Sequence, residues 1–328
     1  MIKVNGSKKR KYAGEFDCKV FMQESYDFRM EDKVEIRNEE EGETLASVLK
    51  KQIQLGKIPK PDKSNINLLI SGLALEKGLL RRSYTEGLAL IGEKSLPALT
   101  EALLKNPNVV VRRAAAKTIK LVGDPNSIPV LVKALTTDLD PVVKGSAAAG
   151  LAIFDEDAVL PLLEVLTRSN NDSLQAGLAI WAIRFIGSRA YKILTVAASS
   201  DNELVRVAAI SSLGEQIQSR DSKDARTEAI IINALKDKYP NVRAEATLIL
   251  SKLSNVEYAI KILFKTLKDP SPEVRINSAL ALVKLKSDKA IHAIESCLKS
   301  EEDQRVKNIF IFSLDKLNQS GGTKISSD

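Results

Sequence analysis

One segment of the chain brings an aromatic pair and a guanidinium together. Trp181 and Phe185 are one helical turn apart, and Arg184 lies between them in the sequence. Residues three and four apart share a face of a helix. Such a cluster offers a planar surface with a cation beside it, which suits a conjugated or anionic ligand. The alternative is that Trp181 is a large core residue that fills a gap between helices.

Two pairs of arginines form a second candidate ligand site. Arg81-Arg82 and Arg112-Arg113 each follow a branched apolar residue, and Tyr84 is close to the first pair. Because arginine binds carboxylates through two parallel hydrogen bonds, these residues predict a cationic edge for carboxylate groups. The alternative is structural. The first arginine of each pair can bond to an acidic or carbonyl group of the adjacent repeat and form a ladder along a seam.

A third basic set is suited to a protein partner. Lys261, Lys265 and Lys268 follow one another at helical spacing. If they lie on a second helix of a repeat, and the second helices form the concave face, they make a basic stripe there. We expect such a stripe to bind an acidic protein.

The sequence lacks the residues of ordinary catalytic machinery. His292 is the single histidine, so a Ser-His-Asp or Cys-His arrangement is available only if His292 serves. Cys18 and Cys297 are far apart, and the count excludes a Cys/His zinc site. No GxGxxG or GxxxxGK[ST] loop is present. We therefore expect no catalytic residue, no metal and no resident cofactor.

Composition narrows the class of partner and the compartment. The 49 Lys and Arg exceed the 42 Asp and Glu, but the two signs are interspersed, which disfavours nucleic-acid binding. No apolar run approaches the length of a membrane span, and no secretory signal is evident. We expect a cytoplasmic protein without membrane insertion.

A repeated motif organises most of the chain. A branched apolar residue, usually followed by a basic one, returns at intervals of about 31 residues, which is typical of helical-repeat solenoids. Each is followed by a helix of small residues, a turn and a second apolar helix. The anchors are Leu80-Arg81, Val111-Arg112, Val143-Lys144, Leu174-Gln175, Val205-Arg206, Val242-Arg243, Val274-Arg275 and Gln304-Arg305.

These repeats predict an all-α, right-handed solenoid of about seven to eight helix pairs over residues 43–317. Residues 1–42 are charge-dense and without helical period, so we expect a weakly ordered arm or a small β hairpin, with the first helix beginning near Thr44. Residues 318–328 should form a flexible tail. One longer interval, before Val242, predicts a polar insertion at 218–226.

The repeat resembles the HEAT family over roughly residues 65–317. Val111–Ala116, Gly123-Asp124 and Ile128–Leu131 carry the pattern Val-Arg-x-x-Ala-Ala, Gly-Asp and a second helix with proline. Val205–Gly214 and Val274–Leu285 repeat its first part. The short period is similar to that of the E/F-type bilin lyases of phycobilisomes and of related phycobilisome assembly and degradation proteins.

That resemblance implies an activity without a catalytic triad. Such proteins attach, transfer or remove a linear tetrapyrrole at a phycobiliprotein cysteine, and the client supplies the thiol. It implies a transiently bound bilin and a partner that is a phycobiliprotein subunit or a second HEAT-repeat lyase subunit. No family motif transfers residue by residue to this chain. The alternative is a non-enzymatic adaptor that binds an acidic protein through its concave face.

Overall fold

The computed structural model describes residues 35–170, 173–217 and 225–322, and the described residues form helices and turns with no strand. The predicted all-α solenoid is confirmed. Its α-helices are α1 (Glu39–Gln54), α2 (Lys63–Ser71), α3 (Gly78–Ile91), α4 (Leu96–Lys105), α5 (Val109–Val122), α6 (Ile128–Thr137), α7 (Pro141–Leu151), α8 (Glu156–Thr167), α9 (Leu174–Ile186), α10 (Tyr191–Ala197), α11 (Glu203–Gln216), α12 (Ala225–Ala234), α13 (Pro240–Ile249), α14 (Val256–Thr266), α15 (Pro272–Lys284), α16 (Ala290–Leu298) and α17 (Gln304–Gly322). Short 3₁₀ turns join several of them, among them η2 (Gly72–Ala74) and η5 (Ala152–Phe154).

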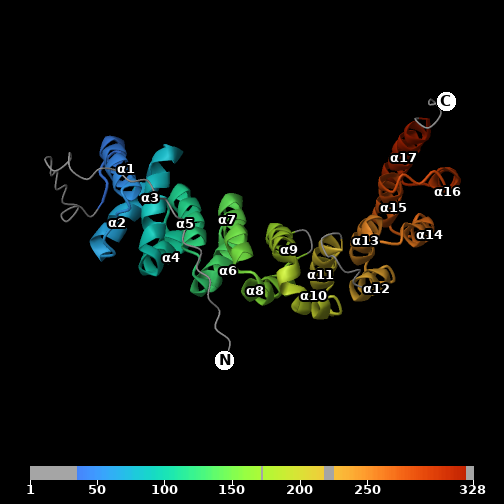
Figure 1. Cartoon of the computed structure of the whole chain (residues 1–328), viewed down its shortest axis with the longest axis horizontal. Coiled ribbons are helices and arrows are strands. Elements are labelled where there is room, and N and C mark those ends of the chain that lie inside the picture. The colour runs from blue at the N-terminus through green and yellow to red at the C-terminus, as the bar shows by residue number, and fades with distance from the viewer. Residues whose placement is uncertain (1–34, 171–172, 218–224, 323–328) are drawn as a thin grey trace, which may run out of the picture.

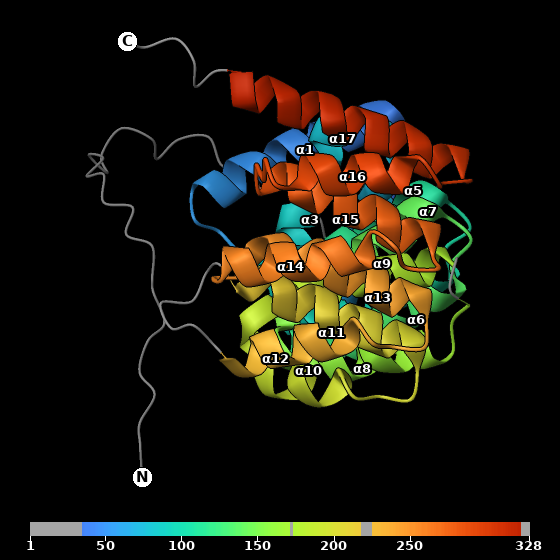
Figure 2. The same cartoon turned by 90° about the vertical axis from the view of Figure 1, so that its right-hand side faces the viewer.

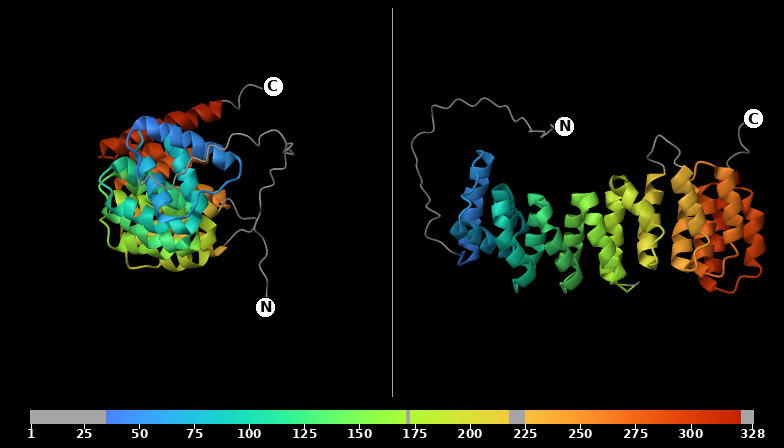
Figure 3. Two further views of the ribbon diagram at one scale, coloured as in Figure 1. Left: turned by 90° about the vertical axis from the view of Figure 1, so that its left-hand side faces the viewer. Right: turned by 90° about the horizontal axis from the view of Figure 1, so that it is seen from below.

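The helices form two rows that follow one arc. The odd-numbered helices, which carry the anchors, lie on the inside of the arc, and the even-numbered helices lie on the outside (Figure 1). Seen from the end of the arc, the helices lie across the stack in roughly parallel layers (Figure 2; Figure 3, left). The view from below shows the layers following one another from α1 to α17 (Figure 3, right). Each outer helix packs against the inner helix that follows it.

The anchor helices therefore make the concave face. The expectation that the second helices would form it is wrong. The reason lies in side-chain size. Ala147 and Ala148 of α7, and Ala179 and Ala182 of α9, are fully buried. Small residues let neighbouring helices approach closely, and the inner helices contact one another along the whole row more extensively than the outer helices do. A close inner row and a wider outer row curve the stack toward the anchors.

Helix caps set the register of the inner row. The side chains of Asn108, Asp140 and Asn202 accept hydrogen bonds from the first-turn amides of α5, α7 and α11. At the other end of α5, Gly123 has φ +70°, a left-handed conformation that glycine adopts without strain. The helices α5, α7 and α11 are thus fixed at their starts by polar caps, whereas α3, α13 and α15 begin without a side-chain cap.

Two of the predicted anchors, Leu174 and Gln304, are not the buried residues at the start of their helices. In α9 the Ser173 side chain caps the amide of Ala176, which is fully buried, whereas Leu174 is half exposed. In α17 the buried residue is Val306, whose amide donates to Asp303, and Gln304 is exposed. Cap position decides the register, and at these two helices the residue pattern misplaced it by two positions.

The chain ends also differ from expectation. Helix α1 begins at Glu39 and not near Thr44, because Asn38 caps the amide of Glu41 and three glutamates occupy the first turn, where the helix dipole favours negative charge. Helix α17 continues to Gly322, so the start of the predicted tail is helical. The predicted hairpin in the arm and most of the predicted insertion lie outside the described residues.

The buried apolar side chains fall into separate clusters. The largest runs from Leu45 to Leu213, through α1 to α11. A second runs from Leu250 to Leu317, and a small one over α11, α12 and α13 lies between them. Across the described ranges no helix is both long and apolar enough to cross a bilayer.

Candidate functional site

A ladder of arginines joins successive repeats. The arginine of each typical anchor donates Nε and Nη2 to one carboxylate that lies just after the next outer helix, with Nε–oxygen distances of 2.7–2.9 Å. The pairs are Arg112–Asp138, Arg206–Asp237, Arg243–Asp269 and Arg275–Glu301. Nη1 of each arginine donates to two carbonyls in the link that follows the preceding outer helix. The ladder interpretation of the anchors is confirmed.

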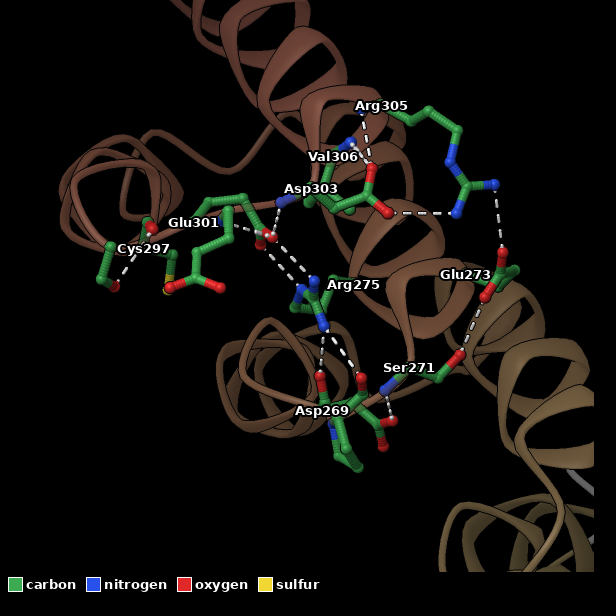
Figure 4. A network of polar contacts seen from close by, with 12 residues as sticks. Asp269, Ser271, Glu273, Arg275, Cys297, Glu301, Asp303, Arg305 and Val306 are labelled. Atoms are coloured by element: carbon green, nitrogen blue, oxygen red, sulfur yellow. Dashed lines mark hydrogen bonds and ion pairs between the residues drawn. The ribbon is translucent and has the colours of Figure 1, made fainter.

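Figure 4 shows the last step of the ladder. Arg275 lies between the Asp269 and Pro270 carbonyls on one side and the Glu301 carboxylate on the other. The hydrogen bond from Arg275 holds the pKa of Glu301 below its usual value, although burial opposes this. The interaction therefore keeps Glu301 ionised in the folded chain.

Two of the predicted ligand-binding residues, Arg112 and Arg81, bond to main-chain carbonyls in the links between helices. Arg112 is largely buried, and its three guanidinium nitrogens are bonded to Asp138 and to main-chain carbonyls, so its assignment to a ligand site is wrong. Arg81 donates Nη1 to the carbonyls of Leu75 and Glu76, has no ion pair among the described residues, and also lines the groove described below. Within the described residues, which leave out 171–172 after α8, Lys144 makes a 3.4 Å hydrogen bond to Gln175.

A groove of about 910 Å³ crosses the concave face. All of its lining residues come from the inner helices α3, α5 and α7. Its apolar lining is Val110, Ala114, Leu121, Val142 and Ala149, its cations are Arg81, Arg82, Arg113, Lys117 and Lys120, and its remaining residues are Gly78, Thr85, Gly145 and Ser146. No lining residue is acidic. The groove is a cationic surface over an apolar floor.

Four cations of the groove, Arg82, Arg113, Lys117 and Lys120, differ in their ion-pair partners. Arg82 pairs with Glu86 at 2.8 Å on the surface of α3. Arg113 donates to both oxygens of Asp140, and this hydrogen bond lowers the pKa of Asp140 to about 2. Within the described residues, neither Lys117 nor Lys120 forms an ion pair. The two lysines are thus the cations most available to a ligand.

Gly145 keeps the groove open beyond the arginines, and a second glycine, Gly177, lies outside the groove lining. The repeat places Gly145 of α7 at the position of Arg113 in α5, and Gly177 lies one repeat further on in α9. A Cβ atom added to either glycine would have no heavy atom within 4 Å. The sequence analysis missed both. The signal was there, because a glycine inside a helix costs about 1 kcal/mol relative to alanine and needs a reason.

The aromatic pair lies one helix beyond the groove. The rings of Trp181 and Phe185 are stacked, with centroids 5.9 Å apart and an interplanar angle of 29°. Trp181 is 47% exposed, so the core alternative is wrong. It follows Lys117 and Ala149 at the repeat interval, and the residues two positions later, Ile119, Leu151 and Ile183, are all buried. The indole therefore continues the groove along the concave face.

The cation beside this pair is not the predicted one. Arg184 bonds to Glu215 at 2.8 Å, and Glu215 also bonds to Lys252. Arg189 lies over the Phe185 ring, 5.8 Å from its centroid, and bonds to Asp155 at 2.7 Å. Arg189 was missed because it follows the glycine that ends α9, where sequence spacing no longer reports a helical face.

Tyr84 and the lysine stripe do not belong to the groove. Tyr84 is fully buried, its hydroxyl donates to the Gly42 carbonyl at 2.7 Å, and burial raises its pKa. It holds α1 on α3, so its predicted contact with a ligand is wrong. Lys261 and Lys265 are exposed on α14 in the outer row, and Lys268 follows that helix. The predicted basic stripe on the concave face is therefore wrong as well.

Nothing in the described ranges resembles a metal centre, since no group of His, Cys, Asp and Glu gathers there in a ligating arrangement. Cys297 is buried, and burial raises the pKa of its thiol. A buried thiol of raised pKa is a poor nucleophile. The described lining of the groove holds cations and apolar residues and includes no cysteine or histidine.

The family model for HEAT repeats matches residues 66–152 and 227–315, more than half of the chain. The chain belongs to the HEAT-repeat family. This HEAT-repeat chain is 40% identical over 285 residues to the bilin biosynthesis protein MpeU of Synechococcus sp. (strain WH8020), a match that covers 87% of this chain and 95% of that protein. The predicted resemblance to bilin lyase-like HEAT-repeat proteins is confirmed.

Solved structures with similar folds are more distant from this HEAT-repeat chain. The complex of CpcE and CpcF of phycocyanin lyase from Nostoc sp. PCC7120 matches with 21% identity and a TM-score of 0.28, over 57% of this chain and 99% of that chain. Yeast importin-beta matches with 15% identity and a TM-score of 0.41, over 86% of this chain and 44% of that chain. The family assignment rests on the sequence matches.

Proposed function

We propose that this chain is a bilin lyase-like protein that acts on phycobiliproteins, and that its concave groove binds the linear tetrapyrrole transiently. The observation that carries the proposal is the groove itself, a cationic surface without acidic lining residues that leads to an exposed Trp181. The name of the relative MpeU, a bilin biosynthesis protein, supports the ligand class.

The groove matches the chemistry of a bilin. A linear tetrapyrrole is a flat conjugated chain that carries carboxylates. Lys117 and Lys120 bind the carboxylates, because neither has an ion-pair partner in the part of the chain that the structure describes, and Arg113 adds positive potential beside its own partner Asp140. The floor around Gly145 leaves room for the ring edges. Trp181 stacks on the conjugated system.

The division of labour follows from what the groove lacks. Cys297, the cysteine within the described residues, is buried in the outer row, and in this proposal the thiol that reacts with the bilin comes from the client. The chain holds and orients the bilin while a phycobiliprotein cysteine attacks or releases it. A phycobiliprotein subunit is the proposed partner, and a second HEAT-repeat lyase subunit is the alternative.

The test uses phycocyanobilin as the probe. Trp181 is the single tryptophan of the chain, so its fluorescence reports on the concave face alone. We expect saturable quenching of Trp181 and a change in bilin absorbance at micromolar concentration. Replacing Lys117→Glu and Lys120→Glu should weaken binding more than tenfold, whereas the same change at Lys261 and Lys265 on the outer row should not.

Two outcomes would count against the proposal. One is the absence of any saturable absorbance change with the native chain. The other is equal loss of binding in the groove variant and the outer-row variant, which would mean that net charge and not the groove attracts the bilin. Client binding without bilin binding would favour the adaptor function.

A further inference from the structure

An exposed apolar row borders the groove. Leu90, Leu121, Ile153 and Phe185 are 44%, 57%, 37% and 60% exposed. They lie at or just past the ends of the inner helices α3, α5, α7 and α9, and they follow one another at the repeat interval. Single exposed apolar residues are ordinary, but one in the same place on each of four successive helices is a continuous patch. We call these four residues the apolar row.

The apolar row ends where the groove and its aromatic extension end. The equivalent positions in the next two inner helices are Glu215 and, just past α13, Lys252, which form an ion pair of 2.8 Å. Arg184, beside the last residue of the row, bonds to the same Glu215. Leu121, the second residue of the row, also belongs to the groove lining. The row thus stops before α11, one helix past the groove.

The spacing of the apolar row fits one kind of partner. Neighbouring helices in a packed row lie about 8–10 Å apart, so the row presents an apolar side chain at roughly that interval. A helix laid across the row advances about 10.5 Å in seven residues, at 1.5 Å per residue. An amphipathic helix with an apolar residue at every seventh position therefore meets one residue of the row per repeat.

The charges beside the apolar row set the polarity of that helix. On the groove side lie Lys117 and Lys120, which have no ion pair among the described residues. Asp124, whose side chain accepts from the amide of Asn126, follows α5, and Asp155, which pairs with Arg189, follows α7. Asp155 thus has a cation partner, whereas within the described residues the two lysines have no ion pair. A partner helix is therefore complementary when its groove-facing flank is acidic.

We propose that the apolar row docks an amphipathic helix of the protein client, with apolar residues at heptad spacing and carboxylates on the flank that faces the groove. This inference rests on the proposed function, because it places the client beside the bound bilin. It adds the apolar row as a second surface, while the acidic flank of the client helix faces Lys117 and Lys120, which also belong to the ligand site.

The test separates the two surfaces. The probes are a fluorescent synthetic amphipathic helix with leucine at heptad positions and glutamate on one flank, and an apo phycobiliprotein α subunit. The double variant Leu90→Glu with Ile153→Glu should weaken binding of both probes by tenfold or more in anisotropy titrations. The matched control, Leu160→Glu with Val196→Glu, replaces two residues that are 62% and 75% exposed on the outer helices α8 and α10 and should bind normally. A milder pair, Leu90→Ser with Ile153→Ser, guards against misfolding.

Phycocyanobilin binding distinguishes failure of this inference from failure of the proposed function. The row variants should still quench Trp181 fluorescence with the native affinity. The inference is overturned if the native chain binds neither probe, if the row variants bind both probes as the native chain does, or if a peptide of scrambled order binds as tightly as the amphipathic one. If bilin binding is normal in any of these cases, the proposed bilin site is still supported and the docking proposal alone is rejected.

Discussion

Arg206 donates to both carboxylate oxygens of Asp237, at 2.7 and 2.8 Å. The same guanidinium donates to the carbonyls of Ser200 and Asp201 and lies 5.4 Å from the centroid of the Tyr239 ring. One side chain thus ties the link after α10, the start of α11 and the link after α12. Since the same arrangement recurs at three other anchors, the repeat interface is held by a conserved geometry of contacts within this chain and not by apolar packing alone.

Removing Arg206 should destabilise the fold strongly. Arg206→Ala leaves Asp237, which is mostly buried, without its counter-ion, and breaking one partner of a buried pair costs about 3 kcal/mol. Urea unfolding followed by circular dichroism measures the loss. Arg305→Ala is the matched control, because Arg305 is 65% exposed and should matter little. Equal losses in the two variants would contradict a structural role for the ladder.

Stability should fall in acid over a defined range. The hydrogen bonds from Arg113 and Arg275 lower the pKa of Asp140, to about 2, and of Glu301. A carboxyl group whose pKa is lower in the folded state stabilises the fold above its unfolded pKa of about 4 and loses that contribution as the pH falls toward the folded value. The urea midpoint should therefore be flat from pH 7 to 5 and drop between pH 4 and 2. Asp140→Asn, which retains a capping side chain, should reduce the slope.

Filling the groove should separate stability from binding. Gly145→Ala meets no neighbour within 4 Å and should stabilise α7 by about 0.5–1 kcal/mol. Gly145→Trp should leave the fold intact but lower phycocyanobilin affinity more than tenfold. Gly72→Ala is the contrasting change, because its Cβ would lie 2.4 Å from the Tyr84 ring and should destabilise the chain. Unchanged bilin affinity in Gly145→Trp would show that the ligand does not lie over α7.

The Tyr84 hydroxyl should affect stability and not binding. Tyr84→Phe leaves the Gly42 carbonyl without its 2.7 Å hydrogen bond and should cost about 1 kcal/mol of unfolding free energy. Thermal unfolding measures this cost, and a phycocyanobilin titration of the same variant should match the native chain. A change in bilin affinity without loss of stability would instead indicate that Tyr84 contacts the ligand.

The sequence predicted the repeat and its ladder because both depend on spacing. The interval of the anchors reports the repeat, and a basic residue at the same place in each unit has a neighbour of fixed geometry. It could not predict which row is concave, because the two helices of a unit are both amphipathic and only the packing of residues such as Ala147 and Ala179 sets the curvature. The lysines of α14 were misplaced for that reason.

The candidate site was predicted in part. Arg82, Arg113 and Trp181 do lie on the concave face, at the groove or its extension. Tyr84 could not be told from a surface tyrosine, since the carbonyl that it binds is in α1, far away in the sequence. Gly145 and Gly177 were missed because glycine has no side chain that would suggest a contact with a ligand. The apolar row was missed because its members are about 32 residues apart in the sequence.

The separation of the buried side chains into clusters has a thermodynamic consequence. The largest cluster ends at Leu213 and another begins at Leu250, and among the described residues a small cluster over α11, α12 and α13 lies between them. Cooperativity in a stacked array passes between neighbouring repeats, so the two ends of this chain are coupled through these three helices. Heating should then melt the molecule in stages, with no single temperature at which the whole chain is half denatured.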